Sequence, residues 1–329
     1  MGEKLLPEGL FASQVAQIRA KESKLLSDND LQKLMQCESY EDCIRLLRDR
    51  GWGSGDDLTA ENLLRNEREN LWKAMRGMCN EQEMHTFDIF RFPKDYHNFK
   101  AAIKEAYVQK EVPNIYLEGG TLPIEKIKAA AASGDFSGFS SQISKAASEA
   151  REVLFHTGDS QMCDVILDRA ALLAMKQAAK ESGNELLEEY AELKCVAANI
   201  NIAIRACRAK KNKDFLQKAF AECDSISVSG LMSAAIEGID AIYDYLEKSS
   251  YADALEAIIE SPAAFDRWCD NRIITLIRPQ KYNPFTISPL AAYVLAKENE
   301  IKSVKIILSG KINQLPDEKV KERLRESYV

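Results

Sequence analysis

The sequence predicts an all-α fold, and three observations support that class. Apolar residues recur at the 3.6-residue spacing of a helix in segment after segment, residues that cap helices stand at the ends of these segments, and one helical unit recurs about every hundred residues. Residues 114–117 are among the few that suit an extended backbone, and nothing supports a sheet. We therefore expect packed helices along the 329 residues.

Polar caps separate the helices expected in the N-terminal part of the chain. The apolar face of the first helix is formed by Phe11, Val15, Ile18, Leu25 and Leu26. Ser27 or Asp28 can cap the next helix, and Ser39 with Asp42 three residues later resembles a capping box. Thr59 then begins a long helix.

Prolines divide the middle of the chain. Pro93 is expected to interrupt an apolar segment that runs to Phe92, a helix follows to about Val112, and Pro123 opens another. Further helices are expected at about 141–154, 160–181 and 184–210.

The C-terminal stretch from Asn283 predicts an amphipathic helix. Ser288 is expected to cap it, Pro289 to occupy its first position, and Gly310 to be the left-handed residue that ends it. Pro316 then restarts a shorter helix.

The internal repeat divides the chain into three. Asn98 and Asn199 lie 101 residues apart in similar helical runs, and Ser303 takes the corresponding place 104 residues later. We expect helical units at 1–112, 113–218 and 219–329.

Buried asparagines are unfavourable unless their amides find partners. We therefore expect Asn98 and Asn199 to satisfy backbone groups where a neighbouring helix is broken; the functional alternative is that they shape a cavity wall. The residue three positions upstream is acidic in two copies, Asp95 and Glu300, and apolar in the other, Val196. Neither the asparagine nor the upstream acid therefore occurs in all three copies.

The copies do not begin at residue 1. The first helix resembles the last helix of a unit, and the helix at Pro316 resembles the first helix of a unit without its remainder. We expect the two ends of the chain to pack near each other and to close three units around a common axis. An open solenoid is the alternative.

Composition narrows the function classes. The net charge of −7 argues against a nucleic-acid partner, and no apolar run approaches the roughly 20 residues that span a bilayer. Without a signal-peptide pattern we expect a cytoplasmic protein whose membrane association comes through a partner. The eight cysteines, with no C-x-x-C pair, are expected to be reduced apolar fillers.

Catalytic and ligand-binding patterns are missing. The phosphate-binding motif G-x-x-x-x-G-K-[ST] does not occur, and the loop with glycines at 51, 53 and 55 is expected to be a surface loop. His85, His97 and His156 have no metal-ligand spacing. We predict no catalytic residue, no cofactor and no metal.

One enzyme alternative remains open at this stage. Asp164 and Asp168, with Asp266 and Asp270 about 102 residues later, could be the paired carboxylates of a magnesium-dependent prenyl-transfer enzyme. Their recurrence in successive repeats favours a structural helix face.

The helix patterns at both ends resemble one family. The resemblance rests on Ala292-Tyr293-Val294-Leu295-Ala296-Lys297, Glu300-Ile301-Lys302, Val304 to Leu308, Gly310-Lys311 and Glu322-Arg323-Leu324, and on Arg19-Ala20-Lys21 to Leu25-Leu26-Ser27. These segments resemble the C (or d) subunit of rotary V-type and A-type ATPases, including the eukaryotic d subunit. The motifs are diffuse, but the helical layout matches along essentially the whole chain.

The resemblance implies a funnel of three similar helical domains around a central cavity. It also implies a non-catalytic rotor adaptor, peripheral to the membrane, that joins the D and F subunits of the central stalk to the membrane proteolipid ring. A helical repeat scaffold unrelated to rotary motors is the alternative, and the magnesium-dependent enzyme is a third class.

Basic residues near the C-terminus are the candidate partner contacts. They are Lys302, Lys305, Lys311, Arg323 and Arg325. The alternative for all five is a solvated helix face.

Overall fold

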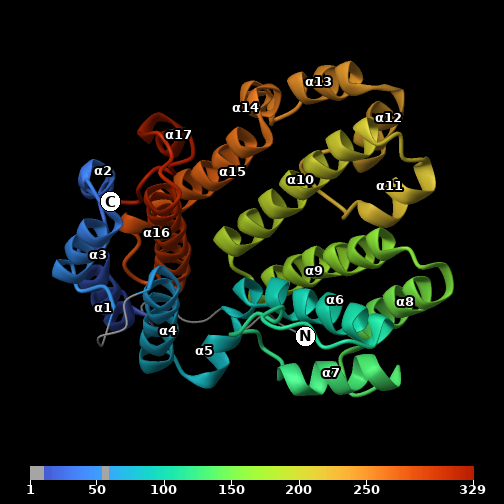
Figure 1. Cartoon of the computed structure of the whole chain (residues 1–329), viewed down its shortest axis with the longest axis horizontal. Helices are drawn as coiled ribbons and strands as arrows, with labels where there is room; N and C mark the ends of the chain where they lie inside the picture. The colour runs from blue at the N-terminus through green and yellow to red at the C-terminus, as the bar shows by residue number, and fades with distance from the viewer. Residues whose placement is uncertain (1–10, 54–58) are drawn as a thin grey trace. The chain divides into compact units, whose positions relative to one another are not determined.

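The computed structural model describes residues 11–53 and 59–329 (Figure 1). Within these residues the chain forms helices and no strand, which confirms the all-α class. The chain divides into two compact units. The terminal unit joins the chain up to Met84 to Glu256–Val329, and the central unit is His85–Leu255. The three-part division of the sequence and the funnel-like arrangement stay predictions.

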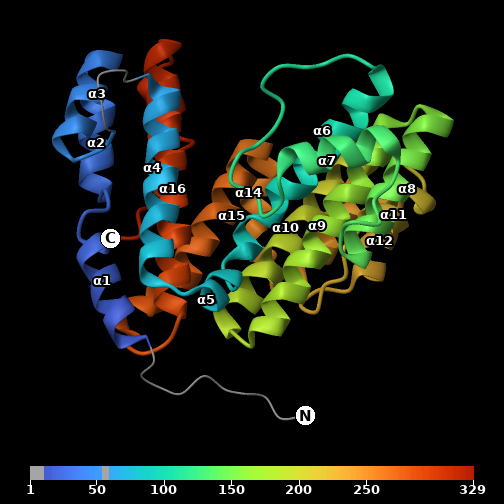
Figure 2. The same ribbon diagram turned by 90° about the horizontal axis from the view of Figure 1, so that it is seen from below.

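The terminal unit is organised around one long helix, α16 (Ser288–Ile312). Its other main helices are α1 (Ala12–Glu22), α2 (Asp28–Gln36), α3 (Tyr40–Asp49), α4 (Ala60–Met78), α15 (Pro262–Ile277) and α17 (Asp317–Lys321). All six pack against α16, and Figures 1 and 2 both show α4 beside it. A 3-10 turn (Arg278–Tyr282) joins α15 to α16, while the short α5 (Glu81–His85) and α14 (Leu255–Glu260) are the helices at which the sequence passes from one unit to the other.

The two ends of the chain pack together in the terminal unit, as expected. The Ser327 hydroxyl donates to the Leu26 carbonyl at 2.8 Å, and the Ser327 amide donates to Asp28 Oδ1 at 3.0 Å. The Tyr328 hydroxyl donates to the Glu22 carboxylate at 3.0 Å. Hydrogen bonds between residues about three hundred positions apart therefore join the two ends of the terminal unit.

The caps predicted for α2, α3 and α4 are confirmed. Ser27 forms a capping box with Asp30 at the start of α2. The Ser39 side chain accepts from the Asp42 amide at the start of α3, and the Thr59 side chain accepts from the Asn62 amide at the start of α4. Each helix start is fixed by a residue within one turn of it, which is why the sequence revealed them.

Four expectations about α16 were wrong. Ser288 is the first helical residue, and Ile287, which has no capping side chain, precedes it, so Pro289 lies in the first turn one position later than expected. Gly310 does not end the helix, because α16 continues to Ile312. A Cβ at Gly310 would lie 2.5 Å from Val320 Cγ2, so this glycine gives α17 room to approach. The helix is also buried on all sides from Ser288 to Lys297 rather than amphipathic throughout.

The central unit is a bundle of long helices. They are α6 (Phe92–Val108), α7 (Ile124–Ser133), α8 (Ser141–Thr157), α9 (Ser160–Ser182) and α10 (Glu185–Arg208), followed by the shorter α11 (Lys213–Ala219), α12 (Val228–Glu237) and α13 (Ile239–Glu247), with 3-10 turns at Asp88–Phe90 and Ala252–Ala254. α9 packs against α6, α8 and α10. Phe99, Ile127 and Leu167 are among the fully buried side chains of its core.

Two expectations for this unit also need correction. Pro93 does not interrupt a helix, because it lies in the first turn of α6, where its missing amide proton costs nothing. Residues 114–117 form no strand: Asn114 lies in a turn, Tyr116 in a bend, and Ile115 and Leu117 have no regular secondary structure. The helix before them stops at Val108, where Gln109 takes the left-handed conformation.

Candidate functional site

Three long helices each hold the chain just before the start of a short helix. In the central unit, α6 holds the segment before α7, and α10 holds the segment before α12. In the terminal unit, α16 holds the segment before α2. We call these contacts the helix-start contacts. Each uses a carboxylate, from Asp95, Glu192 or Glu300; Asp95 and Glu300 are buried, whereas Glu192 is half-buried.

Asp95 on α6 is almost fully buried, and the positive charge that acts on it is that of Arg91, one helical turn before it. Its carboxylate accepts the Thr121 amide at 2.9 Å, the Thr121 hydroxyl at 2.6 Å and the Leu122 amide at 3.1 Å. A Cβ at Gly120 would lie 2.2 Å from Asp95 Oδ1, so only glycine lets the segment come this close. Burial raises the pKa of Asp95, although the hydrogen bonds from Thr121 and Leu122 oppose the rise.

Asn98, one turn along α6, holds the same segment further upstream. Its Nδ2 donates to the Leu117 carbonyl at 2.9 Å, and its Oδ1 accepts the Leu117 amide at 2.8 Å. His97 lies next to it, with Nε2 3.0 Å from the Ile115 carbonyl. The asparagine side chain therefore replaces, for Leu117, the backbone partners that a helix would supply.

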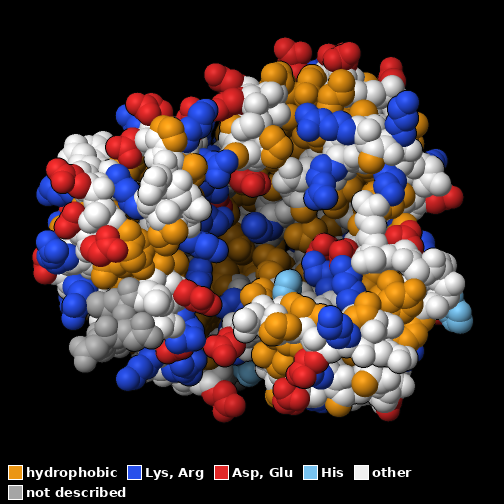
Figure 3. All heavy atoms as spheres, viewed as in Figure 1, with side chains coloured by type: hydrophobic (Ala, Val, Ile, Leu, Met, Phe, Trp, Pro, Cys, Tyr) orange, Lys and Arg blue, Asp and Glu red, His pale blue; other side chains and the backbone are white. Residues whose placement is uncertain are grey.

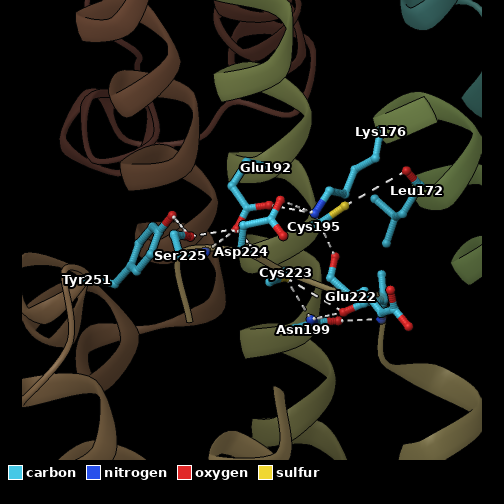
Figure 4. A network of polar contacts seen from close by, with 11 residues as sticks. Leu172, Lys176, Glu192, Cys195, Asn199, Glu222, Cys223, Asp224, Ser225 and Tyr251 are labelled. Atoms are coloured by element: carbon cyan, nitrogen blue, oxygen red, sulfur yellow. Dashed lines mark hydrogen bonds and ion pairs between the residues drawn. The ribbon is translucent and has the colours of Figure 1, made fainter. Parts of the chain in front are cut away.

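Figure 4 shows the corresponding contacts on α10. Glu192 Oε1 accepts the amides of Asp224 and Ser225, each at 2.8 Å, and the Ser225 hydroxyl at 2.7 Å. Its Oε2 pairs with Lys176 Nζ of α9 at 3.0 Å, and Lys176 also reaches Asp224 Oδ2 at 2.8 Å. Tyr251 extends the network through a 2.9 Å contact with the Ser225 hydroxyl.

Asn199 binds a single residue of this segment through both backbone groups. Its Nδ2 donates to the Ala221 carbonyl at 2.7 Å, and its Oδ1 accepts the Ala221 amide at 3.0 Å. The Cys223 thiol lies 3.2 Å from Nδ2. Asn98 and Asn199 are both fully buried, and both pair with a residue about twenty positions later in the chain.

The third helix-start contact has a buried cation beside it. Glu300 Oε1 accepts the Leu26 amide at 2.8 Å, and Lys297 Nζ lies 2.9 Å from Glu300 Oε2. The same ammonium lies 2.8 Å from Glu67 Oε2 on α4 and 4.3 Å from the centre of the Trp52 ring. Burial raises the pKa of Glu300. For Lys297, burial lowers the pKa, but the two carboxylates outweigh it and raise the net value.

Ser303 differs from the two asparagines. Its hydroxyl is buried and has no hydrogen-bond partner among the described residues. The carbonyl of Leu26 is bound instead by Ser327, from the C-terminal segment. In the third copy, the backbone of the bound segment therefore receives this hydrogen bond from a residue outside the long helix.

Glu192 is the residue that the sequence comparison of the three copies missed. In the second copy, the position at which the repeat places the acid is occupied by Val196, which is apolar and buried. Glu192 lies one helical turn before Val196, so its side chain projects from the same side of α10. Searching for an acid at helical spacing, rather than at one fixed position, would have found it.

These contacts fasten chain segments to helices. The oxygens of Asp95 and Glu192 already accept several donors, so the carboxylates hold backbone rather than a ligand. Hydrogen bonds to a charged acceptor are about twice as strong as neutral ones. Each short helix therefore has a fixed starting point on its long neighbour.

Three of the four aspartates of the enzyme alternative form ion pairs within their own units. Lys104 Nζ lies 2.6 Å from Asp164, and Lys100 Nζ lies 2.6 Å from Asp168, so α6 and α9 are joined by two ion pairs. Asp270 pairs with a lysine and an arginine in the terminal unit, and Asp266 is exposed. Among the residues that the structure describes, no three His, Cys, Asp or Glu side chains are placed to hold a metal ion.

The five predicted partner contacts have different surroundings. Lys302 Nζ and Arg325 Nε both lie 2.8 Å from Asp270, and Lys311 Nζ donates to the Met35 carbonyl at 2.6 Å. These three join parts of the terminal unit. Lys305 and Arg323 are exposed. Whether any of the five binds a partner stays a prediction.

The structure also bears on three other expectations, which concern the glycine loop, the cysteines and membrane spans. Gly51 and Gly53 have left-handed backbone conformations, as a loop requires, while Gly55 lies outside the described residues. All eight cysteines are free thiols. No described helix is both long enough and apolar enough to cross a bilayer.

Comparison with known proteins gives a consistent result along the chain. The model of one protein family, described as ATP synthase (C/AC39) subunit, matches residues 14–323. The C subunit of the V-type sodium ATPase of Enterococcus hirae is 23% identical, over 94% of this chain and 97% of the relative. The C subunit of the A-type ATP synthase of Methanocaldococcus jannaschii is 23% identical over 95% of this chain and 86% of its own, and that of Thermococcus kodakarensis is 21% identical over 94% and 89%.

Proposed function

We propose, because this chain belongs to the ATP synthase (C/AC39) subunit family, that it is the non-catalytic central-rotor adaptor of a V-type or A-type rotary ATPase. In this role the chain couples the D and F subunits of the central stalk to the membrane proteolipid ring on the cytoplasmic side of the membrane. Torque passes through it during ATP-driven proton or sodium transport, or during ATP synthesis.

The observation that supports the proposal is the extent of the family match. It runs from residue 14 to residue 323 and so includes both units. Relatives named as C subunits of a V-type sodium ATPase and of an A-type ATP synthase align over more than nine tenths of the chain.

A rotor adaptor must transmit force without deforming, and the helix-start contacts suit that requirement. Asn98 and Asn199 fix segments to long helices, and Lys297 fixes α16 to α4 through Glu67. Close-packed interiors of this kind have low compressibility. Torque transfer requires rigidity and two interfaces, and it does not require a bound ligand.

Co-purification from the native host tests the proposal. The chain, tagged at its N-terminus, is expressed in place of the untagged protein, and membranes are solubilised in mild detergent. We expect both stalk subunits and the proteolipid to be recovered with it. An untagged strain supplies the background.

Deletion of the chain supplies the functional half of the test. We expect membranes without it to hydrolyse ATP with ion transport uncoupled from that hydrolysis, and the intact chain to restore coupling. Recovery of the tagged chain alone, from the soluble fraction, would contradict the adaptor role and would favour the unrelated helical scaffold.

A further inference from the structure

A cluster of unpaired cations lies where α10 ends and α11 begins. We call it the basic turn; it consists of Arg205, Arg208, Lys210, Lys211 and Lys213. No Asp or Glu occurs from residue 193 to residue 213, although the whole chain has a net charge of −7. In the described part of the chain none of the five forms a salt bridge; the nearest lysine in sequence that does is Lys218, which pairs with Glu149. Lys211 is half-buried, and the other four are exposed. Figure 3 shows Lys and Arg side chains over the part of the central unit where Figure 1 places α10 and α11.

Helix electrostatics do not account for the basic turn. Cations near the end of α10 interact favourably with its dipole, which explains Arg205 and Arg208. Lys213, however, is the first residue of α11, where a positive charge is unfavourable. Lys210 has a φ of 49°, a left-handed conformation that favours glycine or asparagine. Two of the five cations therefore lie at positions that local structure disfavours.

The stretch from residue 193 to residue 213, which contains the basic turn, has no exposed large hydrophobic side chain. None of the exposed large hydrophobic side chains of the described residues lies between Phe155 and Ile236. The nearest aromatic ring in sequence, Phe215, is buried, and Lys211 Nζ lies 5.0 Å from its centre. Tight protein interfaces depend on buried aromatic or apolar anchors, and binding of single-stranded nucleic acid depends on exposed rings that stack with bases. The basic turn itself offers charge without such an anchor or ring, which favours a partner that is recognised by its charge.

We propose that the basic turn binds the anionic headgroups of phospholipids at the membrane surface. A cluster of four or more Lys and Arg side chains is attracted to an anionic bilayer without shape complementarity, each by about 1 kcal/mol. The inference rests on the proposed function in one respect: an adaptor attached to a membrane ring lies close to such a surface. The bilayer contact then supplements the protein contacts of the adaptor.

Vesicle binding by the purified full-length chain tests this proposal. Co-sedimentation is measured with vesicles of phosphatidylcholine alone and with vesicles that contain about 30% phosphatidylglycerol, at low salt and at about 0.5 M salt. We expect binding only to the anionic vesicles and its loss at high salt. In the variant Arg208→Gln, Lys210→Asn, Lys211→Gln, Lys213→Gln we expect the partition coefficient to fall by about 100-fold or more. Asparagine is chosen at 210 because it tolerates the left-handed conformation.

The matched control removes the same number of charges elsewhere. Lys24, Lys33, Lys319 and Lys321 are exposed, and acids lie near them in the sequence. Their replacement by glutamine leaves vesicle binding unchanged if the basic turn is the lipid site. Circular dichroism confirms that both variants are folded.

Two results overturn the proposal: equal binding to anionic vesicles by the wild type and the basic-turn variant, or an equal loss in the control variant. In either case an acidic protein surface becomes the occupant to test. Since vesicle binding uses the isolated chain, its failure is distinguishable from failure of the adaptor role, which co-purification with the stalk and the ring measures independently.

Discussion

Asn199 satisfies both backbone groups of Ala221, 22 residues later in the chain, by donating to its carbonyl and accepting from its amide. Neither residue exposes any surface to solvent. One side chain thus supplies the two hydrogen bonds that a regular helix would have given a residue lying between α11 and α12.

Replacing this asparagine by leucine should be strongly destabilising. The size is similar, but two buried backbone groups of Ala221 lose their partners, and each unsatisfied group costs about 1–3 kcal/mol. We expect Asn199→Leu to lower the free energy of unfolding by about 2–5 kcal/mol in urea titrations. Asn201→Leu, on the same helix at a half-buried position, is the control and should change stability by less than about 1 kcal/mol. Equal effects of the two substitutions would contradict the assignment.

Removing the cation at Lys297 should leave two carboxylates buried without a counter-charge. We expect Lys297→Met to reduce the free energy of unfolding by about 3–5 kcal/mol, because Glu67 and Glu300 then repel each other in a low-dielectric site. The triple variant with Glu67→Gln and Glu300→Gln should regain much of that loss. If the triple variant is less stable than the single one, the cost is lost packing over Trp52 and not uncompensated charge.

Gly310 and Val320 should be energetically coupled. Gly310→Ala places a methyl group where Val320 Cγ2 lies and is expected to cost about 1–3 kcal/mol by overpacking. In the Val320→Ala background the same substitution should cost little, and a double-mutant cycle measures the difference. Gly77→Ala, with no atom within 4 Å of the new Cβ, serves as the control and should stabilise α4 by about 0.5–1 kcal/mol. Additive effects at 310 and 320 would show that α17 does not lie against this glycine.

Asp95 and Glu192 should respond to pH in opposite directions. Burial raises the pKa of Glu192, but hydrogen bonds from Ser225 and Lys176 outweigh it, and the net pKa lies below the ordinary value of 4.5. Its stabilising contribution is therefore complete above pH 4.5 and is lost as the pH falls through the lowered value. The pKa of Asp95 lies above its ordinary 3.8, so its contribution is present below pH 3.8 and is lost as the pH rises through the raised value.

Urea unfolding of Glu192→Gln and Asp95→Asn over a pH series measures both contributions. Relative to the wild type, the free energy of unfolding of Glu192→Gln should increase as the pH falls below 4.5. That of Asp95→Asn should increase relative to the wild type as the pH rises above 3.8. Parallel pH profiles for the wild type and both variants would contradict the two shifts.

The sequence was sufficient to predict a local structure wherever the residues that determine it lie within a few positions of it. Ser27, Ser39 and Thr59 cap helices whose first turns they nearly touch, and all three were predicted. The asparagines were recognised because a polar side chain in an apolar helical run requires a partner. The identity of that partner, Leu117 or Ala221, depends on how the chain folds back and could not be predicted.

The predictions from sequence failed where a residue far away in the chain determines the local structure. Gly310 has the context of a helix end, and only the approach of Val320 explains why it lies inside a helix instead. The surroundings of Lys297 could not be predicted, because Trp52 and Glu67, which lie beside its ammonium group, are more than two hundred residues away in the sequence. The acid of the second copy was missed because Glu192 is displaced by one helical turn.

The packing of the two chain ends also sets an order of events during synthesis. The central unit is one continuous segment, so all of its residues have been made before the last helices of the terminal unit exist. The core around Leu31 and Leu63, by contrast, needs Ile301 and Ile307, which the ribosome adds near the end. Pulse proteolysis of chains arrested after Leu255 should find the central unit protected and α1 to α4 digested. Until translation finishes, the earliest helices present uncovered apolar faces, and a holding chaperone or a fast final docking of α16 must protect them.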